Sequence, residues 1–315
     1  MKRWAVLAGQ LALTVLVTWA VVNRVGLGLD ELATLGPGAW IPASPLLAIA
    51  ASALLAVGYF FSAALWGRIV VDLGGPRLPA WDAVRLFMIA NLGRYVPGKV
   101  WQIAGLAALA RARGVAPVTA TGAAILGQGV ALAAATLVGL GALLGGNAAM
   151  RTLGVAGGLV VVTGLVLMSL PMVFDPVARL WFRMARQEPP EGLANVHGLR
   201  WMALYVANWA LYAFAFWLLV ASFGYEVSML PVASAFAAAY VVGYIAIFAP
   251  AGIGVREASL AALLAAHLGL GPAGAVAIIA RVWTTLVEVL PAGAFWVGYM
   301  GARGGSGHGM EMDGE

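Results

Sequence analysis

The chain has 315 residues, of which 63% are hydrophobic and 10% are charged, and its formal net charge at pH 7 is +5. This composition excludes an ordinary soluble domain, in which about a quarter of the residues are charged, and it indicates a membrane protein. The basic residues lie mainly in short segments between apolar runs, as on the cytoplasmic side of membrane proteins, so no nucleic-acid partner is expected. With no cysteine and three widely separated histidines, neither disulfide chemistry nor a metal site is expected.

Apolar runs long enough to cross a bilayer, which takes about 20 residues each, alternate with loops along the chain. We predict a first span at 4–22, with the N-terminus inside, and a second at 46–66. The loop between them, 26–44, carries acidic residues and prolines and is placed outside. The loop after the second span carries three arginines, and the excess of basic residues places it inside.

Residues 91–102, NLGRYVPGKVWQ, interrupt this pattern with charges, a proline and glycines. A charge at the centre of a spanning helix costs about 3 kcal/mol or more, and proline removes a backbone donor. The apolar pieces on either side, 86–96 and 100–110, are each only about half as long as the hydrocarbon core is thick. Because basic loops flank both pieces, we predict a re-entrant hairpin from the cytoplasmic side. Its breaks are Gly93, Pro97 and Gly98.

The span at 117–144 completes the first half of the chain, and the second half repeats the plan. Four further spans are predicted, at 117–144, 153–170, 201–223 and 275–299. Two shorter apolar pieces, 230–248 and 258–268, flank a second break, APAGIGVRE at 249–257, and the alternation of basic loops requires this hairpin to open from the outside. Its breaks are Pro250, Gly252 and Gly254.

The predicted fold is therefore an all-α polytopic membrane protein with six full spans and two re-entrant helical hairpins, which hydropathy would count as about eight segments. Residues 1–300 form a single membrane domain built from inverted repeats, about 1–144 and 153–299, and 301–315 form a disordered tail. Both termini are expected to be cytoplasmic, in a bacterial inner membrane. Broken helices that meet near the bilayer midplane form the substrate site of many transporters.

Several charged side chains fall at membrane depth in this scheme. The candidate substrate-binding residues are Arg94, Tyr95, Lys99, Gln102, Arg256, Glu257, Arg281 and Glu288. Four of them are basic and two are acidic, so an anion would complete the set. Guanidinium groups bind phosphate in a bidentate manner, and a helix that begins near residue 99 directs free N–H groups to the same place.

Two alternatives stay open for these charges. Arg281 and Glu288 lie on one polar face of the last span, with threonines at 284 and 285, and could form an internal contact that only fastens helices. Arg94 and Lys99 could instead extend toward the membrane surface.

Residues 93–100 also reproduce the GxxxxGK part of a nucleotide-binding loop. Val100, however, stands where a magnesium-binding Ser or Thr is required, and Pro97 lacks the backbone N–H that would contact phosphate. We therefore expect neither a nucleotide nor any other cofactor, so transport would be downhill or coupled to ions. Glu257 and Glu288 are the candidates for carrying a proton.

GRYVPGKVWQ at 93–102 and PAGIGVREA at 250–258 resemble the two signature segments of the lysylphosphatidylglycerol synthase transmembrane-region family, which consists of flippase-like membrane proteins. The resemblance extends over nearly all of the chain up to about residue 300. In bifunctional members, a soluble aminoacyl-transferase domain follows the membrane region and makes the lysyl lipid, and the membrane region is implicated in moving it between leaflets. No such domain follows here, so no synthase activity is expected. Ala251 stands where the family often has a second glycine.

The sequence thus predicts a flippase-like lipid translocase, not an enzyme, that binds the anionic headgroup of a phospholipid or a polyprenyl-phosphate lipid in a cationic pocket within the membrane. One alternative is a membrane-embedded transferase, or a glycosyltransferase-associated protein, that uses a polyprenyl-phosphate lipid; it needs a general base, for which only Glu257 qualifies by position. A scaffold subunit is another. Membrane lipids are the expected partners, and a homodimer or a separate lipid-modifying enzyme stays open.

Overall fold

The computed structural model describes residues 34–95, 100–145, 148–189, 198–246, 249 and 252–305. All regular elements within these ranges are helices, which confirms the prediction of an all-α protein. The first predicted span, 4–22, lies outside the described residues, as do residues 306–315 of the predicted tail.

Within the described residues, four helices are long and apolar enough to cross a membrane. They are α3 (Pro45–Asp72), α6 (Pro117–Gly145), α9 (Gly198–Ser222) and the Leu270–Gly298 part of α12 (Leu270–Gly305). These helices coincide with four of the predicted spans, and α7 (Ala148–Ser169) coincides with a fifth. The total of six spans stays a prediction.

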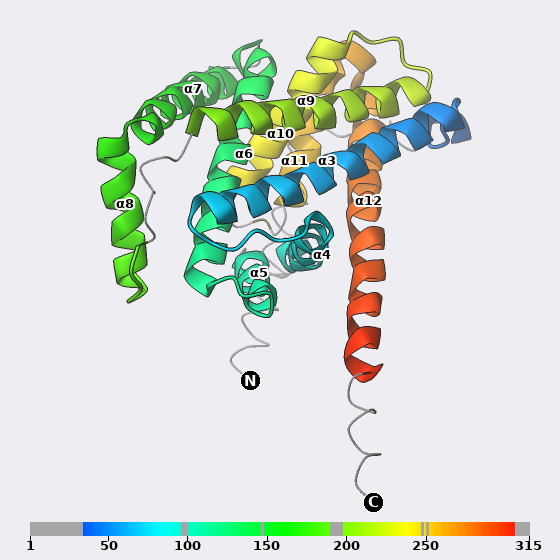
Figure 1. The fold of residues 1–315 in the computed structure, drawn as a ribbon. Helices are drawn as coiled ribbons and strands as arrows, with labels where there is room; N and C mark the ends of the chain where they lie inside the picture. Colours follow the sequence, from blue (N-terminus) through cyan, green and yellow to red (C-terminus); the bar gives the residue numbers. More distant parts are fainter. Residues whose placement is uncertain are drawn as a thin grey trace, which may run out of the picture.

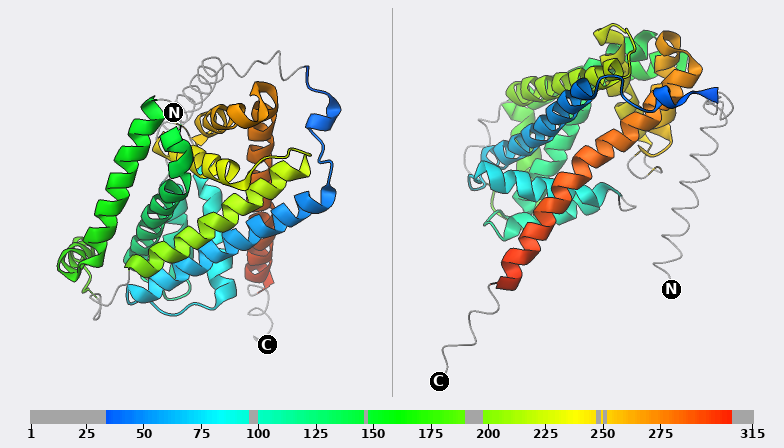
Figure 2. Two further views of the ribbon diagram at one scale, coloured as in Figure 1. Left: turned by 90° about the horizontal axis from the view of Figure 1, so that it is seen from above. Right: turned by 90° about the vertical axis from the view of Figure 1, so that its right-hand side faces the viewer.

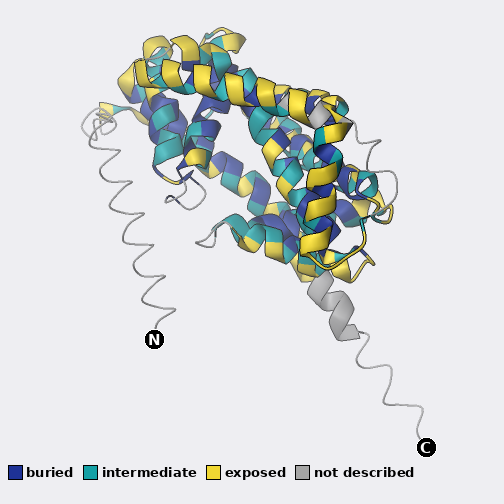
Figure 3. Ribbon diagram, turned by 90° about the vertical axis from the view of Figure 1, so that its left-hand side faces the viewer, coloured by how far each residue is buried: buried dark blue, intermediate teal, exposed yellow. Residues whose placement is uncertain are grey.

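The long helices are joined by shorter elements. A 3-10 turn, η1 (Pro37–Ala39), precedes α3, and α8 (Pro171–Met184) follows α7. In two views α3 and α9 run side by side (Figures 1 and 2), and they pack against each other. Both α7 and α8 lie on one side of the molecule (Figure 1), and many residues of α7 are exposed (Figure 3). Leu159 and Val160 are among them. Exposed aliphatic side chains of this kind suit contact with lipid.

The first predicted break is a helical hairpin made of α4 (Ala80–Asn91), the 3-10 turn η2 (Leu92–Tyr95) and α5 (Trp101–Arg111). Gln102 Nε2 donates a hydrogen bond to Asn91 Oδ1 at 2.5 Å, which joins the two helices across the turn. A Cβ atom on Gly93 would lie 2.7 Å from backbone atoms of Trp101 and Gln102. Only glycine allows the chain to return so closely past this point.

The second hairpin pairs α10 (Met229–Ile245) with α11 (Val255–Leu268). A Cβ atom on Gly252, whose φ is +71°, would lie 2.9 Å from the carbonyl oxygen of Gly243. Gly254 also has a positive φ, +84°, a conformation that favours glycine. The chain therefore breaks at the predicted glycines of both hairpins, while the predicted breaks Pro97, Gly98 and Pro250 lie outside the described residues.

The two ends of the first hairpin meet at one face of the molecule. Asp82 at the start of α4 forms an ion pair with Arg113, just beyond the end of α5. At the end of α3, Asp72 Oδ2 accepts hydrogen bonds from Arg200 Nη2 at 2.7 Å and from Trp201 Nε1 at 2.8 Å. The first hairpin thus opens on the face where α3 ends and where α6 and α9 begin.

The second hairpin opens on the opposite face. Gly145 at the end of α6, Leu230 at the start of α10 and His267 at the end of α11 line one cavity of about 520 Å³. The start of α3 and the end of α9 lie on this side too, where Ser44 N donates to Ser222 O at 2.9 Å. In Figure 1, α4 and α5 accordingly lie below α3 and α9, and α10 begins at the top. The two hairpins point toward each other from opposite faces.

Several helix contacts of one half correspond to contacts of the other half. The contact of α4 with α12 in one half corresponds to the contact of α10 with α6 in the other. The contact of α5 with α6 likewise corresponds to that of α11 with α12. The contact of α3 with α4 corresponds in the same way to the contact of α9 with α10. The inverted repeat stays a prediction, and this correspondence supports it.

Candidate functional site

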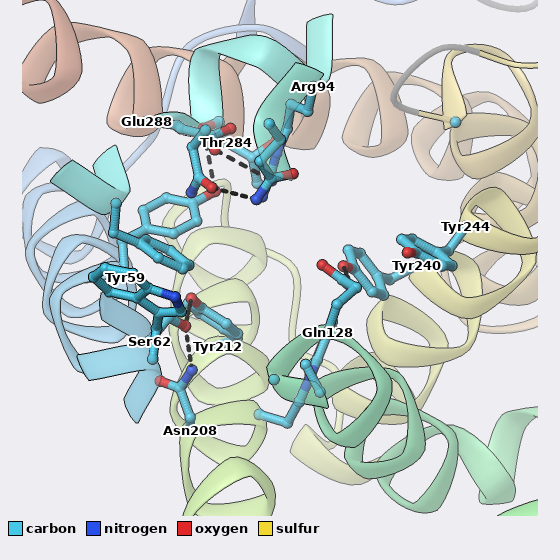
Figure 4. A pocket seen from close by; sticks show the side chains of 18 of the residues that line it. Tyr59, Ser62, Arg94, Gln128, Asn208, Tyr212, Tyr240, Tyr244, Thr284 and Glu288 are labelled. Carbon is cyan, nitrogen blue, oxygen red and sulfur yellow. Dashed lines mark hydrogen bonds and ion pairs between the residues drawn. The ribbon is translucent and has the colours of Figure 1, made fainter. Parts of the chain in front are cut away.

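The tips of the two hairpins and the middle parts of the four long helices surround one cavity of about 180 Å³, called the central cavity below (Figure 4). Tyr59 of α3, Gln128 of α6, Asn208 of α9 and Thr284 of α12 line it. Each lies near the middle of its helix. The cavity therefore lies halfway between the two faces on which the hairpins open.

One wall of the central cavity is an ion pair between the first hairpin and α12. Arg94 of η2 places Nη1 3.2 Å from Glu288 Oε1. Tyr95, the next residue, donates its hydroxyl hydrogen to Glu288 Oε2 at 2.8 Å. The Glu288 side chain is only 3% exposed, so its charge is held by these two partners in a setting where an unpaired carboxylate is very unfavourable.

A second ion pair connects the second hairpin to the same helix. Arg281 Nε lies 3.6 Å from Glu257 Oε1, and the Arg281 guanidinium carbon is 6.0 Å from the centre of the Tyr95 ring. The other carboxylate oxygen of Glu257 accepts a 2.6 Å hydrogen bond from Gly254 N at the start of α11. Two residues of α12, seven positions apart, thus each hold one hairpin.

Arg256 differs from the other two arginines of the cavity. Its guanidinium carbon lies 5.1 Å from the centre of the Phe236 ring and 5.7 Å from that of Tyr240. The described residues place no carboxylate within the 4.0 Å of an ion pair with Arg256. Aromatic faces attract a cation but leave its N–H donors available, so Arg256 is the arginine best placed to receive an anion.

Of the eight predicted site residues, six line the central cavity, one lies next to it, and one lies outside the described residues. Those that line the central cavity are Arg94, Tyr95, Gln102, Arg256, Arg281 and Glu288. Glu257 does not line it but holds Arg281, and Lys99 lies outside the described residues. The internal contact proposed between Arg281 and Glu288 does not form, because each pairs with a different hairpin. Arg94 reaches Glu288 at the cavity wall instead of extending to a surface.

Neutral hydrogen-bonding side chains also line the cavity, and the sequence analysis did not place them in the site. Gln128 Nε2 donates to the Tyr240 hydroxyl at 3.2 Å. Across the cavity, Asn208 Nδ2 donates to Ser62 Oγ at 2.7 Å (Figure 4). A usable signal was present, since Asn208 and Tyr212 are four residues apart in an apolar helix, and polar groups on one face of such a helix point to its interior side.

A metal centre was not expected, and in the described part of the chain no three His, Cys, Asp or Glu side chains come together. The donors that face the cavity are guanidinium, amide and hydroxyl groups. Such groups bind oxygen anions and hydroxyl groups.

The structure combines apolar helices long enough to span a membrane with two helical hairpins that meet at a charged interior cavity. This combination defines a polytopic membrane protein with an internal polar site. The family model described as the lysylphosphatidylglycerol synthase TM region matches residues 6–292, and the chain belongs to this family. Comparison with curated proteins found no match, and comparison with solved structures found none either. The family and the apolar helices together indicate an integral membrane protein associated with lipid modification.

Proposed function

We propose that this protein is a flippase-like lipid translocase, and not an enzyme, and that the central cavity binds the anionic headgroup of a phospholipid or a polyprenyl-phosphate lipid. The observation that carries the proposal is the convergence of Arg94, Arg256 and Arg281 on one cavity. Two of these cations are balanced by carboxylates, and Arg256 is stacked on rings without one among the described residues. A bound phosphate would supply the missing negative charge.

The depth of the site supports a transport role. All the long helices contribute from near their middles, so in a membrane the central cavity would lie close to the midplane. A headgroup bound there would be about equally far from both leaflets. Charged groups at this depth are costly and mark the pathway of a polar substrate.

The two hairpins provide the second support. If α4 with α5, and α10 with α11, re-enter from opposite sides of the bilayer, each would separate the cavity from one leaflet. Both α5 and α11 begin beside the cavity, where Gln102 and Arg256 lie in their first turns. Helix N-termini carry partial positive charge and direct free N–H groups to an anion. Rocking of one repeat against the other would expose the site alternately to the two sides.

The orientation follows from the distribution of charge. Basic side chains such as Arg68, Arg113 and Arg200 lie on the face where the first hairpin opens. By the positive-inside rule this is the cytoplasmic face, in a bacterial inner membrane.

Lipid movement in proteoliposomes tests the proposal. Vesicles would contain a trace of fluorescent phosphatidylglycerol, polyprenyl phosphate or phosphatidylcholine, and external dithionite would destroy the label in the outer leaflet. We expect wild-type protein to make inner-leaflet label of an anionic probe accessible, and Arg256→Gln to reduce that rate at least about tenfold, the effect of losing about 1.4 kcal/mol of binding.

The matched control is Arg179→Gln, because Arg179 is 49% exposed on α8 and pairs with Asp175 one turn away. The control should transport like the wild type. Equal rates for all three proteins would remove the cavity from the mechanism. Turnover of a labelled sugar or aminoacyl donor by the purified protein would instead favour the transferase alternative. Glu257, the general base predicted for that alternative, does not line the cavity, and Glu288 is the carboxylate that does so among the described residues.

A further inference from the structure

The side of the central cavity between α3 and α9 carries no charge and is rich in hydroxyl and amide groups. Ser62, Asn208 and Tyr212, called the neutral cluster below, share two hydrogen bonds: Asn208 Nδ2 to Ser62 Oγ at 2.7 Å, and Ser62 Oγ with the Tyr212 hydroxyl at 2.8 Å. Figure 4 shows this cluster across the cavity from Gln128 and Tyr240.

The hydrogen bonding of the neutral cluster is incomplete. Asn208 is only 1% exposed, yet its Oδ1 has no hydrogen-bond partner among the described residues. Native proteins almost always pair their buried polar atoms. Asn208 lines the cavity, so its unpaired amide oxygen shows that the hydrogen bonding of this side of the cavity is not complete among the described residues.

A second residue with an unpaired amide atom, Asn91 of the first hairpin, lines the same cavity. Asn91 is also 1% exposed, and its Oδ1 accepts the hydrogen bond from Gln102 while its Nδ2 has no partner within the described ranges. Two residues that line the cavity therefore each have one amide atom without a partner among the described residues, an acceptor on Asn208 and a donor on Asn91. A hydroxyl group serves both, because it donates one hydrogen bond and accepts others.

Aromatic rings line the same cavity as these polar groups. The Trp209 ring lies 4.7 Å from that of Tyr240, and the Tyr59 ring lies 5.6 Å from that of Tyr212, measured between ring centres. All four residues line the central cavity. Ring surfaces next to amide and hydroxyl groups suit a ligand that has C–H faces and a perimeter of hydroxyl groups, such as a sugar or another polyol.

We propose that the neutral cluster is a subsite for a neutral, polyhydroxylated group joined to the phosphate that the arginines bind. The cargo is then a phosphodiester lipid with a sugar or polyol headgroup, rather than a lipid with a bare phosphate. This inference rests on the proposed function, because it assigns the remainder of the headgroup to the same cavity.

Four lipids with identical acyl chains separate the contributions of charge and hydroxyl groups. Phosphatidylmethanol, phosphatidylglycerol and phosphatidylinositol carry the same phosphodiester charge but differ in hydroxyl groups, and phosphatidylcholine is zwitterionic. Binding to the full chain in nanodiscs would be followed by tryptophan fluorescence, since Trp66 and Trp209 line the cavity. We expect phosphatidylinositol or phosphatidylglycerol to bind at least about tenfold more tightly than phosphatidylmethanol, as expected for about one well-formed hydrogen bond. Comparing the two favoured lipids shows whether a ring or a glycerol fits.

Variants locate the preference. Asn208→Leu should bind the hydroxylated lipid no better than phosphatidylmethanol, while its affinity for phosphatidylmethanol stays within about twofold of the wild-type value, a change of about 0.4 kcal/mol. Because Asn208 is buried, Ser62→Ala and Tyr212→Phe serve as gentler variants that each remove one hydroxyl. A hydroxyl preference that persists in both would overturn the assignment of this subsite.

The outcomes also separate this inference from the proposed function. If wild-type protein binds the three anionic lipids equally, and all more tightly than phosphatidylcholine, the subsite is refuted and the anion site stands. If no anionic lipid binds more tightly than phosphatidylcholine, the proposed function itself fails.

Discussion

Arg94 and Arg256 line the same cavity, but the structure predicts that their removal has different consequences for stability. Arg94 is the ionic partner of Glu288, whose side chain is 3% exposed. In Arg94→Gln, the Glu288 carboxylate would keep only the hydroxyl of Tyr95. Removing one partner of a buried ion pair lowers the free energy of unfolding by about 3–5 kcal/mol. Because the Arg94 side chain is 28% exposed, the lower end of that range, about 3 kcal/mol, is expected.

Arg256→Gln should cost less. The described residues give Arg256 two aromatic contacts and no ion pair, and a cation over aromatic rings contributes about 0.5–2 kcal/mol. Removing the guanidinium also removes the cost of burying it, so a loss below about 1.5 kcal/mol is expected. The prediction is thus that Arg256→Gln weakens lipid transport without a large loss of stability, whereas Arg94→Gln weakens both.

Equilibrium unfolding in mixed micelles, followed by the fluorescence of the 12 tryptophans, measures these values. The double variant Arg94→Gln with Glu288→Gln completes the comparison, since two amides can hydrogen-bond without a charge. It should be more stable than Arg94→Gln alone, with a coupling energy of about 2 kcal/mol, within the range for directly contacting residues. Equal destabilisation by the two single arginine variants, or strict additivity in the double variant, would refute this account of the ion pair.

Two further predictions concern the hairpins and the topology. Gly93→Ala should destabilise the fold by about 1–3 kcal/mol, because the added Cβ would lie 2.7 Å from backbone atoms. Gly105→Ala in α5, where a Cβ would meet no atom within 4 Å, should be neutral or stabilising by up to about 1 kcal/mol. Thermal unfolding of both variants checks the contrast, and equal effects would contradict the tight turn at Gly93. Since the chain has no cysteine, single cysteine variants report on which side of the membrane a residue lies. Glu226 lies in the loop between α9 and α10, and Arg113 lies just beyond the end of α5. A membrane-impermeant maleimide should label Glu226→Cys in intact cells but Arg113→Cys only after lysis, and external labelling of Arg113→Cys would reverse the assignment of the first hairpin.

Much of the fold could be predicted because membrane-spanning helices are recognisable in a sequence by their length and apolar composition. The apolar runs matched α3, α6, α9 and α12, since about 20 apolar residues are needed to cross a bilayer. The breaks were predictable for a related reason, because glycine and proline within an apolar run free backbone groups that must be satisfied inside the protein.

The partners of the buried charges could not be predicted. Arg281 and Glu288 share a helix face, but at 1.5 Å per residue they are about 10 Å apart along the axis, too far for direct contact between most side chains. Their partners, Glu257 and Arg94, come from hairpins that are distant in sequence. Only the folding of both hairpins onto α12 brings these pairs within 4 Å.

The neutral part of the cavity was missed for a different reason. A single amide such as Asn208 in an apolar helix has the same sequence signature whether it fastens two helices or faces a ligand. The distinction depends on which of its atoms remain unpaired, and that depends on the packing of α3 against α9.

Native mass spectrometry of the purified protein tests the central claim most directly, because a lipid held by its headgroup in the cavity survives purification and can be identified by mass. The account predicts that the wild type and the control Arg179→Gln, which changes an exposed arginine, retain a phosphate-bearing lipid. Arg256→Gln should not retain it, because this variant loses the cation that has no ion-pair partner among the described residues. Equal retention of the same lipid by all three proteins, or retention of uncharged lipid alone, would contradict it.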